Sequence, residues 1–219
     1  MELRNVIREL RLLANPDKVK FKQEKFGIRS TNSLGIYQSD LQLFDSGIYE
    51  ARILCSKIYK PESLTERQMD KWVVTFENWE ICDSFCMGLF SKSRFALTKA
   101  IAWSGHESEF VKRAGFVIIA SYGFANKSAD NDTFIDFLNI IETEVEDNRI
   151  YVRKAVNWAL RNIGKRNIDL HAAAVKSAKK ILKNPSKSAQ WIAKDALKEL
   201  MSPAIKMLDY PRGIYRRKE

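Results

Sequence analysis

The sequence predicts an all-α fold in which helix pairs of the HEAT or armadillo kind stack into an α-α superhelix, or solenoid. Almost no stretch shows the alternating pattern of a β-strand, whereas apolar residues recur with a helical period along most of the chain. Several helices also share a local sequence pattern, in which a charged residue is followed by small and large apolar residues. This pattern recurs at intervals of roughly 30 to 41 residues. An ordinary helical bundle is the alternative fold.

The N-terminal elements are predicted from amphipathic periodicity and from proline and glycine. Residues 1–14 form a helix with one apolar side. Pro16 suits the first turn of a second helix, which ends at Gly27 because glycine readily adopts the left-handed conformation of a helix stop. The next elements are a polar loop over 29–35 and helices over 36–44 and 48–59.

The starts of the later helices are marked by residues that favour helix N-termini, because proline, asparagine, aspartate or serine stands near the start of each helical pattern. The predicted helices cover 65–77, 79–89, 92–103, 107–124, 131–145, 148–163, 168–183 and 187–200. We expect one domain over 1–219, made of N-terminal helices and a loop over 1–35, a repeat body over 36–200 and a basic C-terminal tail over 201–219.

The charge balance favours a polyanionic partner. Lysine and arginine number 37 against 27 aspartates and glutamates, and the formal net charge of the 219-residue chain is +10. Such an excess favours nucleic acid ahead of a membrane surface. The alternative is a basic protein whose lysines are scattered over its surface.

Cysteine usage and hydropathy exclude several other classes. Cys55, Cys82 and Cys86 do not form a disulfide framework, and no histidine cluster completes a metal-ligand set, so we expect no metal and no cofactor. The N-terminus lacks the pattern of a signal peptide, and the longest nearly apolar run, residues 115–125, is too short to cross a membrane. We therefore expect a cytoplasmic protein.

An indole and a carboxylate stand four positions apart at Trp79 and Asp83. On a helix this spacing is about one turn, so both side chains leave the same face. Negative charge beside a π face suits recognition of a cation. The alternative is an ordinary helix with a buried tryptophan and a solvated aspartate. If successive inner helices of a solenoid line one wall, this pair can share a concave basic groove with Arg113 and Trp158.

Three motifs occur in order along the chain, at residues 79–83, 110–114 and 152–161. Together they resemble the DNA alkylation-repair glycosylases built from HEAT-like repeats, the AlkD-like family. The resemblance covers roughly residues 36–166, and on an all-helical, basic chain of this size three motifs in order are fairly specific. One position departs from the family pattern, because Phe110 stands where tryptophan is frequent, and this change affects packing more than chemistry.

The resemblance implies roles for individual residues. Asp83 is similar to the family's catalytic carboxylate, and Trp79 and Trp158 resemble aromatic walls on either side of the lesion's deoxyribose. Arg113 resembles an arginine that meets the DNA backbone near the lesion. Further cations of the same motifs are candidates for phosphate contacts, namely Lys112, Arg153, Lys154, Arg161, Lys165 and Arg166. For each cation, a solvated helix surface is the alternative.

The chemistry of N-glycosidic cleavage fits a single carboxylate. The sugar becomes cationic in the transition state, and a fixed aspartate stabilises that charge. A purine alkylated at N3 or N7 is itself cationic and leaves as a neutral base, so little general-acid help is needed. The family resembled here holds its lesion within the duplex, whereas most glycosylases extrude the base.

The expected function is therefore removal of cationic alkylpurines of the 3-methyladenine or 7-methylguanine type from duplex DNA by a monomeric enzyme. The alternative is a non-catalytic relative that binds unusual DNA structures or a protein partner through the same groove.

The other polar candidates suggest structural roles. Helix capping or exposure is expected for His106 and His171, a core position for Cys82 and Cys86, packing between repeats for Trp72, Trp103 and Trp191, and a position away from DNA for Glu142, Glu144, Glu146 and Asp147.

Overall fold

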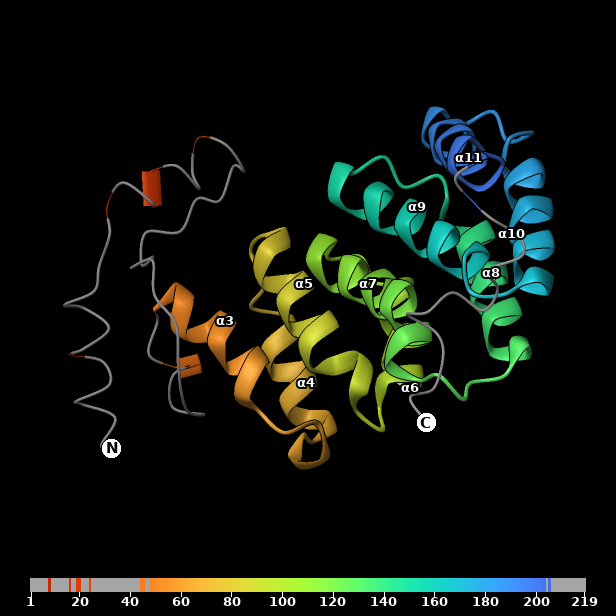
Figure 1. The fold of residues 1–219 in the computed structure, drawn as a ribbon. Helices are drawn as coiled ribbons and strands as arrows, with labels where there is room; N and C mark the ends of the chain where they lie inside the picture. The colour runs from red at the N-terminus through yellow and green to blue at the C-terminus, as the bar shows by residue number, and fades with distance from the viewer. Residues whose placement is uncertain are drawn as a thin grey trace. The chain divides into compact units, whose positions relative to one another are not determined.

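The computed structural model describes residues 8, 16, 19, 20, 24, 44, 45, 48–203 and 205. Within these residues the chain forms nine α-helices and no β-strand, as the sequence predicts (Figure 1). The helices are α3 (Tyr49–Ile58), α4 (Glu66–Val73), α5 (Trp79–Gly88), α6 (Ala96–Ser104), α7 (Glu109–Ala125), α8 (Asn131–Glu144), α9 (Ile150–Gly164), α10 (Ile168–Ile181) and α11 (Lys187–Leu200). The helices predicted at 1–14, 16–26 and 36–44 and the C-terminal tail lie outside the described residues, apart from single positions.

Helix starts follow the capping residues that the sequence offers. Thr65 closes a capping box with Gln68, and asparagine or aspartate side chains cap α5, α8 and α10 at Asn78, Asp130 and Asn167. The predicted helix 92–103 differs from the structure, where a 3-10 turn over Phe90–Lys92 precedes α6. The backbone of Ser93 is extended, so the two segments do not join. No described helix has the length and apolar character needed to cross a membrane.

The chain divides into two compact units, Met1–Ser93 and Arg94–Glu219, and each is described by itself. The first contains α3, α4 and α5 around an aromatic core in which Phe85 of α5 lies edge-on to Trp72 of α4, with ring centroids 5.5 Å apart. Gly88 allows α5 to approach α3 closely, because a Cβ at this position would lie 2.8 Å from the backbone oxygen of Ser56. The expectation of a single domain stays a prediction.

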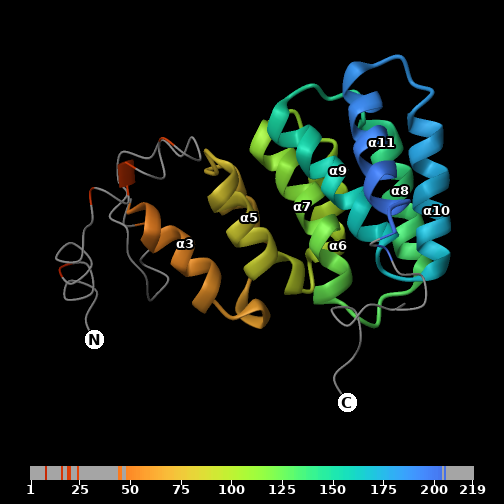
Figure 2. The ribbon, with the colours of Figure 1, turned by 45° about the horizontal axis from the view of Figure 1, so that its top comes forward.

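The second unit is built from three consecutive helix pairs, α6 with α7, α8 with α9, and α10 with α11 (Figures 1 and 2). Helix α9 packs between α7 and α11, and α8 packs against both α6 and α10. The pairs therefore stack as two layers, one of α6, α8 and α10 and the other of α7, α9 and α11. At the tightest point of the first pair, a Cβ on Gly115 would lie 2.5 Å from the backbone nitrogen of Ser104.

Hydrogen bonds between neighbouring pairs recur at one repeat length. The bond from Lys165 to Glu199 joins residues 34 positions apart, and the bond from Arg166 to Gly123 joins residues 43 positions apart. Asn157 Nδ2 likewise donates to the carbonyl oxygen of Ile192, 35 positions away. These spacings of 34 to 43 residues are close to the predicted interval of roughly 30 to 41 residues, as expected for a stack of helical repeats.

Candidate functional site

Helix α5 separates a core face from a polar face. Cys82, Phe85 and Cys86 are completely buried, as expected for core residues, whereas Trp79 and Asp83 are both partly exposed. The four-residue spacing puts the indole and the carboxylate on neighbouring positions of one helix surface. The structure thus places the predicted pair on the outward side of α5, with Asp83 neither fully buried nor fully solvated.

The start of α5 is held by its capping residue and by a tyrosine of α3 that sequence reasoning did not identify. Asn78 caps the helix, with its Oδ1 accepting from the Ile81 N–H at 3.1 Å. The Tyr49 hydroxyl of α3 lies 3.0 Å from both Asn78 Oδ1 and Glu80 Oε2. Burial, followed by the charge and the hydrogen bond of Glu80, raises the pKa of Tyr49 well above its usual range. Tyr49 therefore stays protonated and fixes the first turn of α5, which carries Trp79.

One face of α9 carries four of the predicted site residues. Lys154, Trp158, Arg161 and Lys165 follow one another at spacings of three or four, so they lie along the same surface of the helix. Lys154 is exposed and forms no ion pair with any described carboxylate, and Trp158 is partly exposed.

Arg161 and Lys165 both bind Glu199 of α11, Lys165 through a contact of 2.6 Å. Burial alone would raise the pKa of Glu199, but the hydrogen bonds from Lys165 and Arg161 outweigh it and lower the pKa. These two cations therefore join α9 to α11.

Lys112 and Arg113 of α7 are buried and have internal partners. Lys112 Nζ lies 2.6 Å from Glu144 Oε2 and 3.1 Å from Asp147 Oδ2. Arg113 Nη1 donates to the carbonyl oxygen of Tyr151 at 2.6 Å, which ties α7 to the first turn of α9. Both residues thus have a structural role, and their predicted contacts with DNA stay predictions.

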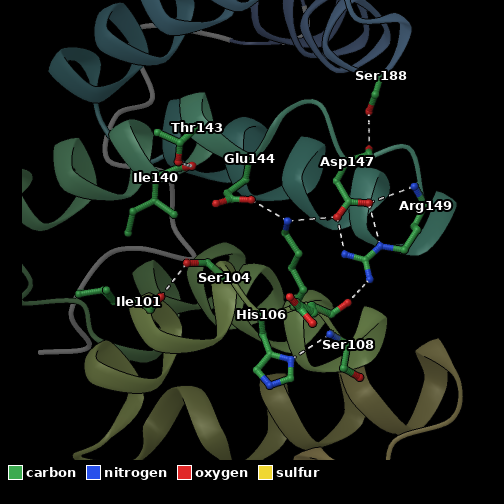
Figure 3. Close-up of polar contacts among 12 residues, drawn as sticks. Ile101, Ser104, His106, Ser108, Ile140, Thr143, Glu144, Asp147, Arg149 and Ser188 are labelled. Atoms are coloured by element: carbon green, nitrogen blue, oxygen red, sulfur yellow. Dashed lines mark hydrogen bonds and ion pairs between the residues drawn. The ribbon is translucent and has the colours of Figure 1, made fainter.

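Asp147 is the centre of the cluster in Figure 3. Its Oδ1 accepts from Arg149 Nε at 3.0 Å, and its Oδ2 lies 2.5 Å from Arg149 Nη2. Burial alone would raise the pKa of Asp147, but hydrogen bonds from Arg149 and Lys112 lower it to about 2. Arg149 also donates to the carbonyl oxygen of Glu107, so the cluster links the starts of α7 and α9. We name Lys112, Glu144, Asp147 and Arg149 the interhelix ion cluster.

Trp191 packs against a residue of the neighbouring repeat, as expected, whereas Arg166 differs from its expected role. Trp72 and Trp103 are buried as expected for packing, but Trp191 of α11 is 36% exposed and lies under the guanidinium of Arg153, which is 4.7 Å from the ring centroid. Arg166 is buried and donates to the carbonyl oxygens of Gly123, Lys127 and Ala129. It therefore satisfies backbone oxygens at and after the end of α7 and is not available to phosphates.

The structure brings the site residues together in two sets. Trp79 and Asp83 share a face of α5, whereas Arg113 and Trp158 lie on the packed helices α7 and α9 of the second unit. A common groove that contains all four stays a prediction. Within the described residues there is no group of three acidic, cysteine or histidine side chains placed to hold a metal ion.

The fold has a counterpart among solved structures. One chain matches with a TM-score of 0.68 and 19% sequence identity, and the match covers 91% of this chain and 95% of that chain. It is described as a member of "a new family of proteins related to the HEAT-like repeat DNA glycosylases with affinity for branched DNA structures". The match confirms the predicted solenoid of HEAT-like repeats over an ordinary bundle.

Sequence comparison gives two results. No curated protein matches the chain. The model of the family described as "DNA alkylation repair enzyme" matches residues 29–200, which is more than half of the chain. The chain belongs to the DNA alkylation repair enzyme family.

Proposed function

We propose that this protein is a monofunctional DNA glycosylase that hydrolyses the N-glycosidic bond of cationic alkylated purines in duplex DNA and so initiates base excision repair. The observation that carries the proposal is the pair on α5. In a member of a DNA alkylation repair family, a partly exposed aspartate stands one helical turn from a partly exposed tryptophan. The substrates are lesions of the 3-methyladenine and 7-methylguanine type.

Asp83 acts on the sugar. As the bond between C1′ and the purine nitrogen breaks, its electron pair moves onto the cationic base, which leaves neutral, and positive charge develops on the deoxyribose. The Asp83 carboxylate stabilises that charge, an effect on the order of 3 to 4 kcal/mol for a preorganised group. It also orients the water whose oxygen bonds to C1′ and accepts the proton that this water loses.

Three further residues have supporting roles, namely Trp79 of α5 and Trp158 and Lys154 of α9. Trp79 and Trp158 offer π faces to the developing sugar cation, each effect being about 0.5 to 2 kcal/mol where water is excluded. Lys154 contacts a phosphate without reading sequence, since its charge has no partner among the described carboxylates. In this proposal the lesion stays in the duplex, which is the mode that the family resemblance implies.

A base-release assay tests the proposal. Duplex DNA carrying 3-methyladenine and 7-methylguanine is incubated with the purified protein, and the released bases are separated and measured by chromatography. We expect release of the cationic bases and none of a neutral lesion such as hypoxanthine, which needs a general acid to leave. Absence of release above background contradicts the proposed activity, and normal release by both Trp79→Ala and Trp158→Ala contradicts the aromatic walls.

A second candidate function is binding of branched DNA without catalysis. It is favoured by the solved structure with the same fold, which is described as having affinity for branched DNA. An electrophoretic mobility assay with a four-way junction and a linear duplex of equal length measures this preference. Preferential binding of the junction together with no base release supports the second function over the first.

A further inference from the structure

A groove between α8 and α10 carries a row of lysines that the candidate site does not use. The groove has a volume of about 760 Å³, and its α10 side is lined by Lys176, Lys179, Lys180 and Lys183. All four are exposed. Lys176, Lys179 and Lys180 lie on one surface of α10, and Lys183 lies two residues beyond the end of the helix at Ile181. We name these four residues the α10 lysine row.

Most of the charge in this groove is uncompensated. Glu142 of α8 is the one carboxylate in the lining, and it is bound by Lys180 and by the Ser177 hydroxyl at 2.7 Å. Among the described residues, no carboxylate pairs with the other three lysines. Four lysines against one glutamate leave three positive charges in excess on the groove wall, which is the arrangement of a polyanion site.

The chemistry of the lining points to a sugar-phosphate backbone. No aromatic side chain lines the groove, so it has no surface on which a base can stack. From Lys176 to Lys180 the row extends about 6 Å along the axis of α10, and Lys183 follows just after the helix, so the row can meet about two successive phosphates of one strand. Such a contact is independent of sequence.

The row lies in a different layer from the candidate site residues of the second unit. Trp158 and Lys154 are on α9, which packs with α7 and α11, whereas the row is on α10, in the layer of α6 and α8. The buried side of α10 packs inward, so the lysines face away from α9. The lysine row and the α9 candidates are therefore carried by helices of different layers.

We propose that the α10 lysine row binds the phosphate backbone of a second DNA segment, such as the second arm of a branched DNA, while the first segment occupies the α9 face. This inference rests on the proposed function in one respect, because the proposed function is what places the first DNA segment on the α9 face. The row adds affinity for DNA with two arms and contributes little to binding of a single straight duplex.

The test compares two triple variants of the full-length protein. Lys176→Gln, Lys179→Gln and Lys183→Gln remove the unpaired charges of the row and keep helix propensity, since glutamine and lysine are similar helix formers. Lys57→Gln, Lys60→Gln and Lys92→Gln remove three exposed charges from the other unit and serve as the matched control. Dissociation constants are measured for a four-way junction and a linear duplex over a range of salt concentrations, with circular dichroism as a check of folding.

For the row variant we expect junction binding to weaken by about tenfold or more and its logarithmic salt slope to fall by about 2 to 3, because each lost phosphate contact removes roughly 0.9 from that slope. Binding of a linear duplex and base release from a linear methylated duplex should each change less than about twofold. Substitutions of surface residues outside a binding contact usually have effects of this size. The control variant should keep the preference for the junction.

Three results would overturn the inference. One is unchanged junction binding in the row variant. Another is an equal loss for junction and duplex in both variants, which would assign the effect to net charge. The third is a row variant that no longer binds a glutamate-rich amphipathic peptide but still binds the junction as the wild type does. That result would show that the groove binds a protein partner instead of DNA. A protein that prefers junctions through the row but releases no base would contradict only the proposed glycosylase activity.

Discussion

Two aspartates, Asp147 and Asp83, illustrate how the same residue type takes different roles in this chain. Asp147 joins Arg149 and Lys112 in the interhelix ion cluster, and these hydrogen bonds lower its pKa to about 2. Asp83 instead lies partly exposed on the outward side of α5, one turn from Trp79. The first aspartate connects helices, and the second is the proposed catalytic carboxylate.

The same contrast separates the cations. Lys112 is buried between Glu144 and Asp147, whereas Lys154 is exposed and pairs with no described carboxylate. Both belong to motifs from which DNA contacts are predicted. The count of 37 lysines and arginines therefore overstates the number of cations available to DNA, because some of them are already paired with carboxylates between repeats.

The largest expected effect on stability comes from Lys112→Met. Removal of the ammonium leaves Glu144 and Asp147 close to each other with less compensation, and loss of one partner of a buried ion pair costs about 3 to 5 kcal/mol. Denaturant unfolding measures the change. The control is Lys154→Met, for which we expect less than about 0.5 kcal/mol because the side chain is exposed. Equal effects of the two substitutions would remove the distinction between buried and exposed cations.

A smaller effect is expected from Gly88→Ala, which tests how α5 is seated. The new methyl group would lie 2.8 Å from the backbone oxygen of Ser56, so α5 must shift, at a cost of about 1 to 3 kcal/mol. Because α5 carries Asp83, base release should fall with stability. Gly105→Ala is the matched control, since its nearest neighbour would lie at an ordinary 3.9 Å. Thermal unfolding and base release of both variants decide the outcome.

The smallest effect concerns acid stability. The pKa of Asp147 is lower in the folded protein, about 2, than its ordinary value of 3.8, so its contribution is present above about pH 4 and is lost as the pH falls toward 2. After screening by solvent we expect about 1 to 2 kcal/mol. Asp147→Asn should remove this part of the pH dependence of unfolding. An unchanged acid profile in that variant would show that the cluster does not hold Asp147 ionised.

Local patterns explain how much of the fold the sequence predicts. Capping residues such as Asn78 and Asp130 are recognisable in sequence, so the helices from α3 onward are predicted within a few residues at most ends. The apolar residues of α5 likewise predict that Trp79 and Asp83 lie away from its core.

Contacts between repeats are not encoded locally. The carbonyl partners of Arg166, the bond from Arg113 to Tyr151 and the stacking of Arg153 on Trp191 all join residues about one repeat apart. Which of two neighbouring cations turns inward depends on the exact rotation of each helix in the stack. Sequence alone therefore identifies candidate cations for DNA but does not separate those already paired within the protein.

The same substitution at both aspartates tests the central claim most directly. Base release from methylated duplex DNA is measured for Asp83→Asn and Asp147→Asn at a temperature where both variants are folded. We predict that Asp83→Asn reduces the rate per folded molecule by about 100- to 1,000-fold, while Asp147→Asn lowers stability and keeps the rate per folded molecule. Wild-type release by Asp83→Asn would contradict the assignment of Asp83 as the catalytic carboxylate.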